Sequence, residues 1–304
     1  MKKQIPVFFI HTGYQPYMER TIHQAEKMND IVYLLGDSNN KQVAKRWVNI
    51  ADYESPKYKE FRNLYKHMST NTDEFEFNCF RRFFVSYEFA KEKGIDEFVM
   101  LDTDCFAFVN FSELGFEGYD VGLSIPKDQS NYLWTASPHG SYWTLNALER
   151  FLKFLEWEYT ENIAELEEKW KYHTEHGILG GICDMTLLYL WCISEKGLKT
   201  LYTGQEYKGG VFDHFVSVAE GYEANEYKVD SFLKLKRYKI KDSKAYFQKI
   251  DGSWVRAYTI HAQGRSKEYI NAISKGVDNR FHLYLLKMFN LIHRIIRKIV
   301  SLNK

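Results

Sequence analysis

The chain has 304 residues, of which 45% are hydrophobic and 17% aromatic, so it can bury a sizeable core in one large or two small domains. Its 41 basic and 40 acidic residues nearly cancel, and this balance argues against a nucleic-acid-binding protein. The four cysteines form no CxxC pair, the N-terminus lacks the apolar run of a secretion signal, and no apolar stretch is long enough to span a membrane, so we expect reduced thiols in a cytoplasmic protein.

Short apolar runs alternate with helical patterns along the first two thirds of the chain. Predicted strands cover residues 6–10, 30–35, 97–101 and 120–125, and predicted helices cover residues 16–28, 57–66, 79–93, 145–155, 161–171 and 184–195. Residues 198–258 break into short strands and polar turns. The alternation predicts an α/β fold with a mixed, mostly parallel sheet flanked by helices. We expect one domain over residues 1–275, made of halves 1–125 and 126–275, and a separate tail over residues 276–304.

Four candidate ligand-binding residues stand where predicted strands end. Thr12 and Gly13 follow the first strand, Asp37 follows the second, and Asp102 follows the third. In open α/β sheets, ligands bind outside the carboxyl ends of the strands. We therefore expect these residues to meet at one edge of the sheet.

The motif Asp102-Thr103-Asp104 directly follows the apolar run at residues 97–101. Residues one apart on a strand share a face, so both carboxylates can point to one ion if the strand extends through Asp104. Mg²⁺ and Mn²⁺ take oxygen ligands and keep positions open for phosphate oxygens. The alternative is a pair of acids that cap the following turn, because so short a motif is common by chance.

Four segments, residues 7–13, 79–84, 98–104 and 180–185, together resemble the GT-A-type glycosyltransferases that build bacterial surface polysaccharides. They resemble, in order, the family's nucleotide-binding start, the helix whose arginine faces the metal, the metal motif and the acceptor-side loop. The resemblance spans about residues 5–190 and implies a GT-A-like Rossmann-type fold. The metal motif and the Gly-Gly-x-Cys-Asp element are its most specific parts.

The resemblance also implies a set of donor-side residues. Mn²⁺ or Mg²⁺ is expected on Asp102, Asp104 and His261, the last at the end of the apolar run 258–260; His11, His139 and His214 are weaker alternatives. The residues expected to bind the nucleotide-sugar are Thr12, Gly13, Asp37, Arg82, Thr103 and Lys267. Arg82 is preferred to Arg81 by its position in the resemblance, and the alternative for it is a solvated helix arginine.

The expected acceptor-side residues are Asp184, Gly180, Gly181 and Trp143. Asp184 opens a predicted helix and is the candidate general base for an acceptor hydroxyl, although an acid at a helix start also satisfies free backbone N–H groups. The two glycines would let the backbone approach a sugar closely. Trp143 and Trp134 stand in a polar stretch, where an indole could stack on a sugar ring.

The tail is predicted to form a basic amphipathic helix over residues 281–300. Seven apolar residues fall on one face, and Lys287, Arg294, Arg297 and Lys298 fall on the opposite face; residues 280–304 contain no acid. Such a helix suits an anionic membrane surface, here through residues 280–300, and its alternative is packing on the domain or on a partner subunit.

Together these patterns predict a metal-dependent glycosyltransferase that moves a sugar from a nucleotide-diphospho-sugar, UDP-linked rather than GDP-linked, to a saccharide or lipid-linked acceptor. We expect it to be peripheral on the inner face of the cell membrane. One rival is a nucleotidyltransferase on a similar α/β scaffold, although only Gly13 follows the first strand where that class has a glycine-rich loop. A second rival is a non-catalytic membrane-associated protein with a vestigial site.

Overall fold

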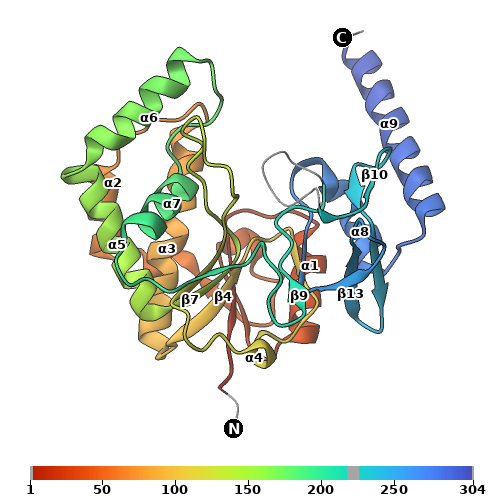
Figure 1. Ribbon diagram of the computed structural model, residues 1–304, viewed down its shortest axis with the longest axis horizontal. Helices are drawn as coiled ribbons and strands as arrows, with labels where there is room; N and C mark the ends of the chain where they lie inside the picture. Colours follow the sequence, from red (N-terminus) through yellow and green to blue (C-terminus); the bar gives the residue numbers. More distant parts are fainter. Residues whose placement is uncertain (1–2, 218–225, 303–304) are drawn as a thin grey trace.

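The computed structural model describes residues 3–217 and 226–302. The fold is built around one mixed sheet (Figure 1), which has seven strands. The strand order is β3-β2-β1-β4-β7-β6-β8. All neighbours pair in parallel except β7, which runs antiparallel to both β4 and β6. The strands are β1 Val7–His11, β2 Val32–Gly36, β3 Trp47–Asn49, β4 Glu97–Leu101, β6 Val121–Ser124, β7 Ser137–Thr144 and β8 Thr200–Tyr202. The predicted mixed, mostly parallel α/β sheet is confirmed.

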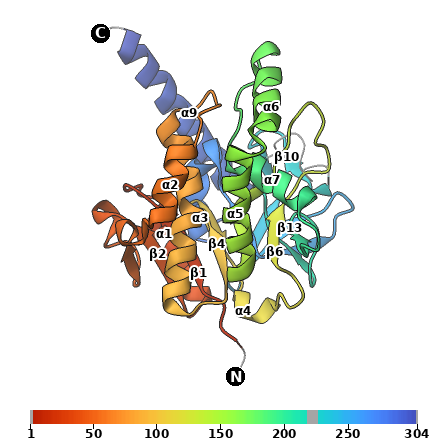
Figure 2. The same ribbon diagram turned by 90° about the vertical axis from the view of Figure 1, so that its left-hand side faces the viewer.

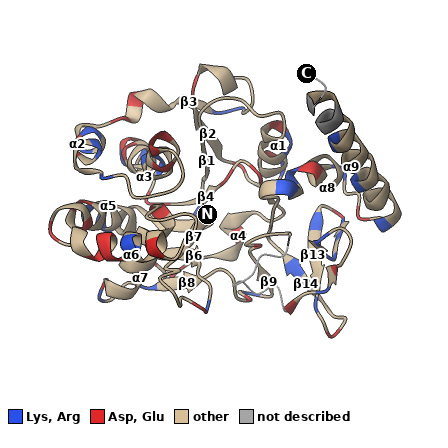
Figure 3. Cartoon of the chain, turned by 90° about the horizontal axis from the view of Figure 1, so that it is seen from above, with Lys and Arg blue, Asp and Glu red and all other residues tan. Residues whose placement is uncertain are grey.

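Alternate side chains of the central strands pack into two separate hydrophobic cores, one on each face of the sheet. Phe8 of β1 packs into the core that includes the helices on one face, whereas Val7 and Phe9 pack into the core on the other face. This two-sided burial explains why the strands are continuous apolar runs. The first face is covered by α2 Pro56–Leu64, α3 Asp73–Lys93, α5 Leu145–Thr160 and α7 Asp184–Ser194, with α6 Ile163–Glu175 beyond them, and the second by α1 Met18–Met28 and α4 Phe111–Leu114 (Figures 2 and 3).

Helix α3 begins six residues earlier than its apolar pattern predicts. Thr72 caps it, because the Thr72 side chain accepts a hydrogen bond from the backbone N–H of Phe75. Acidic residues in the first turn interact favourably with the positive end of the helix dipole and stabilise this helix start. This polar first turn concealed the helix start from the periodicity, and Gly94 ends the helix in the left-handed conformation, as expected.

A smaller β-rich region has its own core and consists of strand β5 together with elements that follow the main sheet in sequence. It contains a four-stranded sheet of order β12-β13-β14-β9 and two antiparallel pairs, β10-β11 and β5-β15, the second of which joins segments far apart in sequence. Its elements are β5 Cys105–Ala107, β9 Gly210–Val211, β10 Val229–Asp230, β11 Leu235–Lys236, β12 Tyr238–Lys241, β13 Lys244–Gln248, β14 Trp254–Ala257, β15 Thr259–His261, the 3-10 helix η4 Gly264–Tyr269 and α8 Ile270–Ser274. The final helix, α9, spans Arg280–Leu302. The domain boundary expected near residue 275 falls between α8 and α9 and stays a prediction.

The placement of Trp143 in a polar loop was wrong. Trp143 lies in β7, the central antiparallel strand that the sequence did not predict, and its side chain is 0% exposed. The indole N–H donates to the Ser141 hydroxyl at 2.8 Å, and the ring stacks on Trp191 at 5.9 Å. A side chain enclosed in this way packs the core and cannot stack on an acceptor sugar.

Candidate functional site

The motif Asp102-Thr103-Asp104 forms a tight turn between β4 and β5, because β4 ends at Leu101 rather than continuing through Asp104. The turn is fixed by its backbone: the Asp102 N–H donates to the His139 carbonyl at 2.8 Å, and the Asp102 carbonyl accepts from Cys105 at 2.9 Å. The Thr103 carbonyl accepts from the Thr21 hydroxyl of α1 at 2.6 Å. The expected extended strand is therefore replaced by a rigid turn, which still brings both carboxylates into one site.

His261 reaches this turn through the pairing of β5 with β15. In that antiparallel pair His261 lies opposite Cys105, the residue after Asp104. The Ala262 N–H donates to the Asp104 carbonyl at 2.9 Å, and the His261 Nε2 lies 3.1 Å from Asp104 Oδ1. Ligand atoms of Asp102, Asp104 and His261 all lie within 4.8 Å of one another. The three predicted metal ligands therefore stand together.

The chemistry of these three groups fits a divalent cation. The His261 Nδ1 lies 2.6 Å from the His214 carbonyl, so Nδ1 must carry a hydrogen and donate it. In a neutral imidazole the Nε2 lone pair then faces a carboxylate oxygen, which is also an acceptor. Either a proton or a metal ion between the two resolves this opposition. Burial alone would lower the pKa of His261, but the hydrogen bond and charge of Asp104 outweigh it and raise the pKa.

Two cationic side chains flank the carboxylates. The Lys267 ammonium lies 3.0 Å from Asp104 Oδ2, and the Arg82 guanidinium donates to Asp102 Oδ1 at 2.9 Å. Although burial opposes it, the pKa of Asp104 is lowered by His261 and Lys267. Burial also opposes the rise in the pKa of Lys267, which the Asp104 charge produces. Against the effect of burial, the pKa of Arg82 is also raised by the charges of Asp184 and Asp102, so the Lys267 and Arg82 side chains are both held charged beside the two carboxylates.

Arg82 also joins the metal motif to Asp184. Its second arm donates to Asp184 Oδ2 at 2.5 Å, and the other Asp184 oxygen accepts from the Met185 N–H at 2.9 Å. Asp184 is buried, and this burial raises the pKa of its carboxyl even against the nearby guanidinium. Arg81, the alternative arginine, pairs instead with Glu54. Arg82 is thus the arginine that faces the carboxylates.

One pocket of about 560 Å³ contains this constellation. The sequence-predicted residues that line it are Thr12, Arg82, Asp102, Thr103, Asp104, Gly180, Gly181, Asp184, His261 and Lys267. His11 and His139, two of the alternative histidines, also line it, and the lining residues that were not predicted include Tyr17, Asn71, Phe75, Asn78 and Gln263. Phe75 and Asn78 lie in the polar first turns of α3 that the periodicity missed, so a capping signal at Thr72 could have pointed to them.

Gly13 and Asp37 lie behind Thr12 instead of lining the pocket. The Gly13 N–H donates to Asp37 Oδ2 at 2.8 Å, and Asp37 also accepts from the Asn39 N–H at 3.0 Å. Burial would raise the pKa of Asp37, but these hydrogen bonds lower it. Gly13 adopts φ +80°, a conformation that glycine favours. In this structure the pair shapes the loop that carries Thr12.

The two acceptor-side glycines have different surroundings. Gly181 has φ +146°, and a side-chain Cβ there would lie 2.2 Å from the Met68 carbonyl oxygen. The close approach at Gly181 is therefore to the chain's own segment at Met68 and Ser69, not to a sugar as expected. Gly180, with φ +96°, has open space where a Cβ would lie. Only Gly180 leaves room for a ligand.

His139 and His214, the weaker histidine alternatives, support His261 from behind. The His139 ring stacks on the His261 ring at 4.3 Å, and its two nitrogens contact the Ser137 hydroxyl and the Asp213 carbonyl. Burial holds the pKa of His139 well below its ordinary value. The third alternative, His11, lies 3.2 Å from the Thr103 hydroxyl. The arrangement leaves His261 as the histidine that faces both carboxylates.

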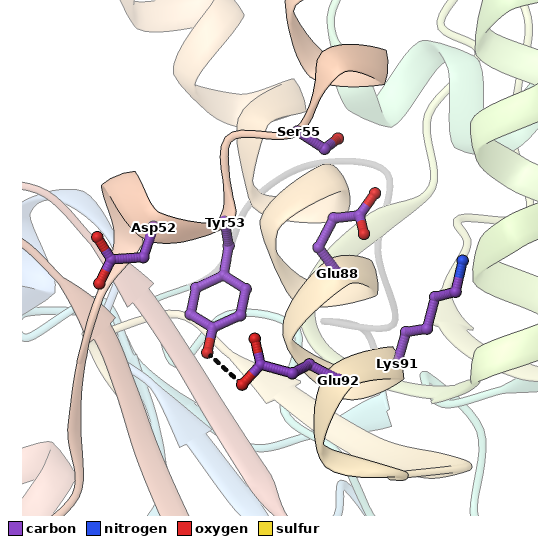
Figure 4. A pocket seen from close by; sticks show the side chains of 6 residues that line it. All are labelled: Asp52, Tyr53, Ser55, Glu88, Lys91 and Glu92. Atoms are coloured by element: carbon purple, nitrogen blue, oxygen red, sulfur yellow. Dashed lines mark hydrogen bonds between the residues drawn. The ribbon is translucent and has the colours of Figure 1, made fainter.

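A second depression, of about 300 Å³, lies on the outer side of α3 (Figure 4). It is lined by Asp52, Tyr53, Ser55, Glu88, Lys91 and Glu92. Its one drawn hydrogen bond joins the Tyr53 hydroxyl to Glu92 at 3.2 Å. It shares no residue with the pocket around Asp102 and does not extend that site.

Comparisons with known proteins add a structural likeness. No family model matches the chain, and no curated protein matches it in sequence. Mouse xyloside xylosyltransferase 1 is similar in structure over 64% of this chain and 84% of its own, with 12% identity and a TM-score of 0.45. The bifunctional glycosyltransferase WbbM covers 95% of this chain and 52% of its own, with 9% identity and a TM-score of 0.48. The glycosyltransferase GlyE of Streptococcus pneumoniae covers 66% and 46%, with 12% identity and a TM-score of 0.34. The chain thus spans about half the length of the last two.

Proposed function

We propose that this chain is a divalent-metal-dependent glycosyltransferase that uses a nucleotide-diphospho-sugar, UDP-linked, as its donor. The observation that carries the proposal is the convergence of Asp102, Asp104 and His261 at the end of β4. The pocket around them is also lined by the cationic side chains of Arg82 and Lys267. Carboxylates with one imidazole suit Mn²⁺, and Mg²⁺ is the alternative. When bound, the ion would neutralise negative charge that develops on the departing diphosphate.

Lys267 is the residue best placed to meet the leaving diphosphate. Its side chain is partly exposed and stands 3.0 Å from Asp104, so its ammonium can serve the carboxylate and a phosphate oxygen on the same side of the pocket. A preorganised cation of this kind stabilises charge that forms in the transition state. Thr12, on the loop fixed by Gly13 and Asp37, would contact the nucleoside part of the donor.

Arg82 and Asp184 act together in this proposal. A general base needs a carboxylate oxygen that is free to reach the acceptor hydroxyl, but one Asp184 oxygen accepts from Arg82 at 2.5 Å and the other accepts from the Met185 N–H at 2.9 Å. The geometry therefore favours Asp184 as a positioning residue that holds Arg82 against Asp102, instead of the general base that its place in the sequence suggested. The acceptor, a saccharide or a lipid-linked saccharide of a bacterial surface polysaccharide, would enter along Phe75, Asn78 and Gly180.

The test is a screen of UDP-sugars and GDP-sugars for nucleotide release in the presence of Mn²⁺. We expect release from at least one UDP-sugar, loss of release with a chelator, and loss in Asp104→Asn. Asp242→Asn is the matched control, because Asp242 is an exposed turn residue with φ +50°, a conformation that asparagine also tolerates. Release from none of the donors, or equal release by Asp104→Asn and Asp242→Asn, would contradict the proposal.

A further inference from the structure

Helix α9 lies beside β10 and α8 (Figure 1), and its polar side contacts the rest of the chain. The Tyr284 hydroxyl donates to Asp230 at 2.6 Å, and Arg280 pairs with the same carboxylate. One turn further on, Lys287 donates to the Phe232 carbonyl. Two leucines of this side are apolar: Leu283 is buried in the core of the β-rich region, and Leu286 is partly buried against it.

The same side of α9 continues toward η4. The Asn290 amide donates to Glu268 at 3.3 Å, and the Arg294 guanidinium lies 3.6 Å from that carboxylate. Lys287 and Arg294, the two described members of the basic face, are therefore turned toward the domain. The side chains of Arg297 and Lys298 lie outside the described residues.

The apolar side of α9 consequently faces away from the protein. Its exposed residues are Phe281, Leu285, Met288, Phe289, Leu291, Ile292, Ile295, Ile296 and Val300. At about 100° per residue, this set covers roughly half of the helix circumference. Seen from above, α9 lies at the edge of the molecule, beyond α8 and β13 (Figure 3). The amphipathic helix is thus mounted with its apolar half outward.

The width of the apolar half of α9 distinguishes between two candidate partners, a second helix and a lipid surface. In a paired helix, Phe281, Leu285, Met288, Ile292 and Ile295 would form a narrow seam with heptad spacing. Phe289, which is 66% exposed, and Ile296 lie beside that seam, so a second helix would leave both in water. A flat lipid surface accepts the whole apolar half, as interfacial helices require.

Charge favours the same partner. Residues 280–304 contain six Lys or Arg and no Asp or Glu. Arg280 and Arg294 pair with acids of the domain. The remaining positive charge of the segment, from Lys287, Arg297, Lys298 and Lys304, complements an anionic surface and repels a second copy of itself. Among the described residues, no helix is long and apolar enough to cross a membrane. We propose that α9 lies in the plane of an anionic lipid surface, with its apolar half inserted and its polar side holding the domain.

The segment that α9 contacts is adjacent in sequence to a residue of the pocket. Glu268, the η4 residue that contacts Asn290 and Arg294 of α9, directly follows Lys267, which faces Asp104. A lipid-anchored helix would therefore hold the pocket next to the membrane. The proposal stands independently of the reaction, because it rests on α9 and not on the metal site.

The experiment is co-sedimentation of the full chain with vesicles of phosphatidylglycerol and phosphatidylethanolamine, or of phosphatidylcholine alone. We expect binding to the anionic vesicles, weaker binding in high salt, and on the order of tenfold weaker partitioning for Ile292→Glu. The matched control is Ile250→Glu, because Ile250 is 59% exposed on the body of the molecule and Ile292 is 51% exposed. That control should bind like the unchanged chain.

Sedimentation velocity of both variants completes the test. A monomer that binds anionic vesicles and loses binding only with Ile292→Glu supports the proposal. A stable dimer that Ile292→Glu dissociates, with no vesicle binding by the unchanged chain, would overturn it in favour of a second copy. Equal vesicle binding by Ile292→Glu and Ile250→Glu would also overturn it.

Discussion

The buried pair of Asp213 and Lys236 is predicted to support the metal site from behind. Asp213 accepts from the Lys236 ammonium at 2.7 Å, from the His261 backbone N–H at 2.9 Å and from the Phe215 N–H at 3.2 Å. Both charged side chains are less than one tenth exposed. Replacing Asp213 with Asn removes the negative charge and turns an NH₂ group toward one of the donors, because an amide has only one acceptor oxygen.

We expect Asp213→Asn to lower the free energy of unfolding by about 3 to 5 kcal/mol, since it leaves the Lys236 charge buried without a counter-charge. Chemical denaturation followed by circular dichroism measures this loss. Because His261 is held by the same carboxylate, Mn²⁺ affinity should fall as well, and a titration of the folded variant measures that change.

A second substitution separates the charge effect from general disruption. In Asp213→Asn/Lys236→Met the unpaired charge is gone, and Tyr227 and Phe247, whose rings lie 4.8 and 5.4 Å from the ammonium, offer an apolar surround for the methionine. The double variant should recover at least half of the lost stability. A single variant within about 1 kcal/mol of the unchanged chain, or no recovery in the double variant, would refute this reasoning.

Two further outcomes concern stability. Burial lowers the pKa of Lys169 to about 8, whereas the pKa of an unfolded lysine is about 10.4. Between these two pH values the unfolded chain binds more protons than the folded chain. The free energy of unfolding should therefore rise with pH across that window, by up to about 3 kcal/mol. Urea denaturation at several pH values should show a smaller rise in Lys169→Met, and an equal rise would count against the buried ammonium. Gly181→Ala should cost about 2 to 4 kcal/mol because its Cβ meets the Met68 carbonyl, whereas Gly180→Ala should cost about 1 kcal/mol; equal thermal-denaturation losses would contradict this contrast.

The central strands and the metal motif could be predicted from local sequence. The runs around Phe8 and Val99 are apolar because both faces of each strand are buried. Each run therefore indicates a strand from the local sequence alone. The two acids after β4 were expected to extend that strand, but the turn held by His139 and Thr21 converges their oxygens instead. The sequence thus located the motif correctly, but a turn, and not an extended strand, brings the two carboxylates together.

The parts of the site that depend on distant contacts could not be derived in this way. His261 meets Asp104 across 157 residues through the register of two three-residue strands. Its place at the end of a predicted strand and the family resemblance pointed to His261, but no local pattern gives that register. The ion pair of Arg82 with Asp184 is likewise a tertiary contact that changes the chemistry expected of Asp184. Trp143 was misplaced because β7 contains Pro138 and Gly140, residues that disfavour a strand in sequence.

The central claim is that Asp102, Asp104 and His261 bind a divalent ion together with the donor diphosphate. Isothermal titration of Mn²⁺ into the chain, with and without UDP, tests it most directly. We predict that UDP tightens Mn²⁺ binding in the unchanged chain and in Asp242→Asn, and that Asp104→Asn removes both the Mn²⁺ binding and its coupling to UDP. Mn²⁺ binding that is unchanged in Asp104→Asn, or UDP binding that is indifferent to Mn²⁺ in the unchanged chain, would contradict the claim.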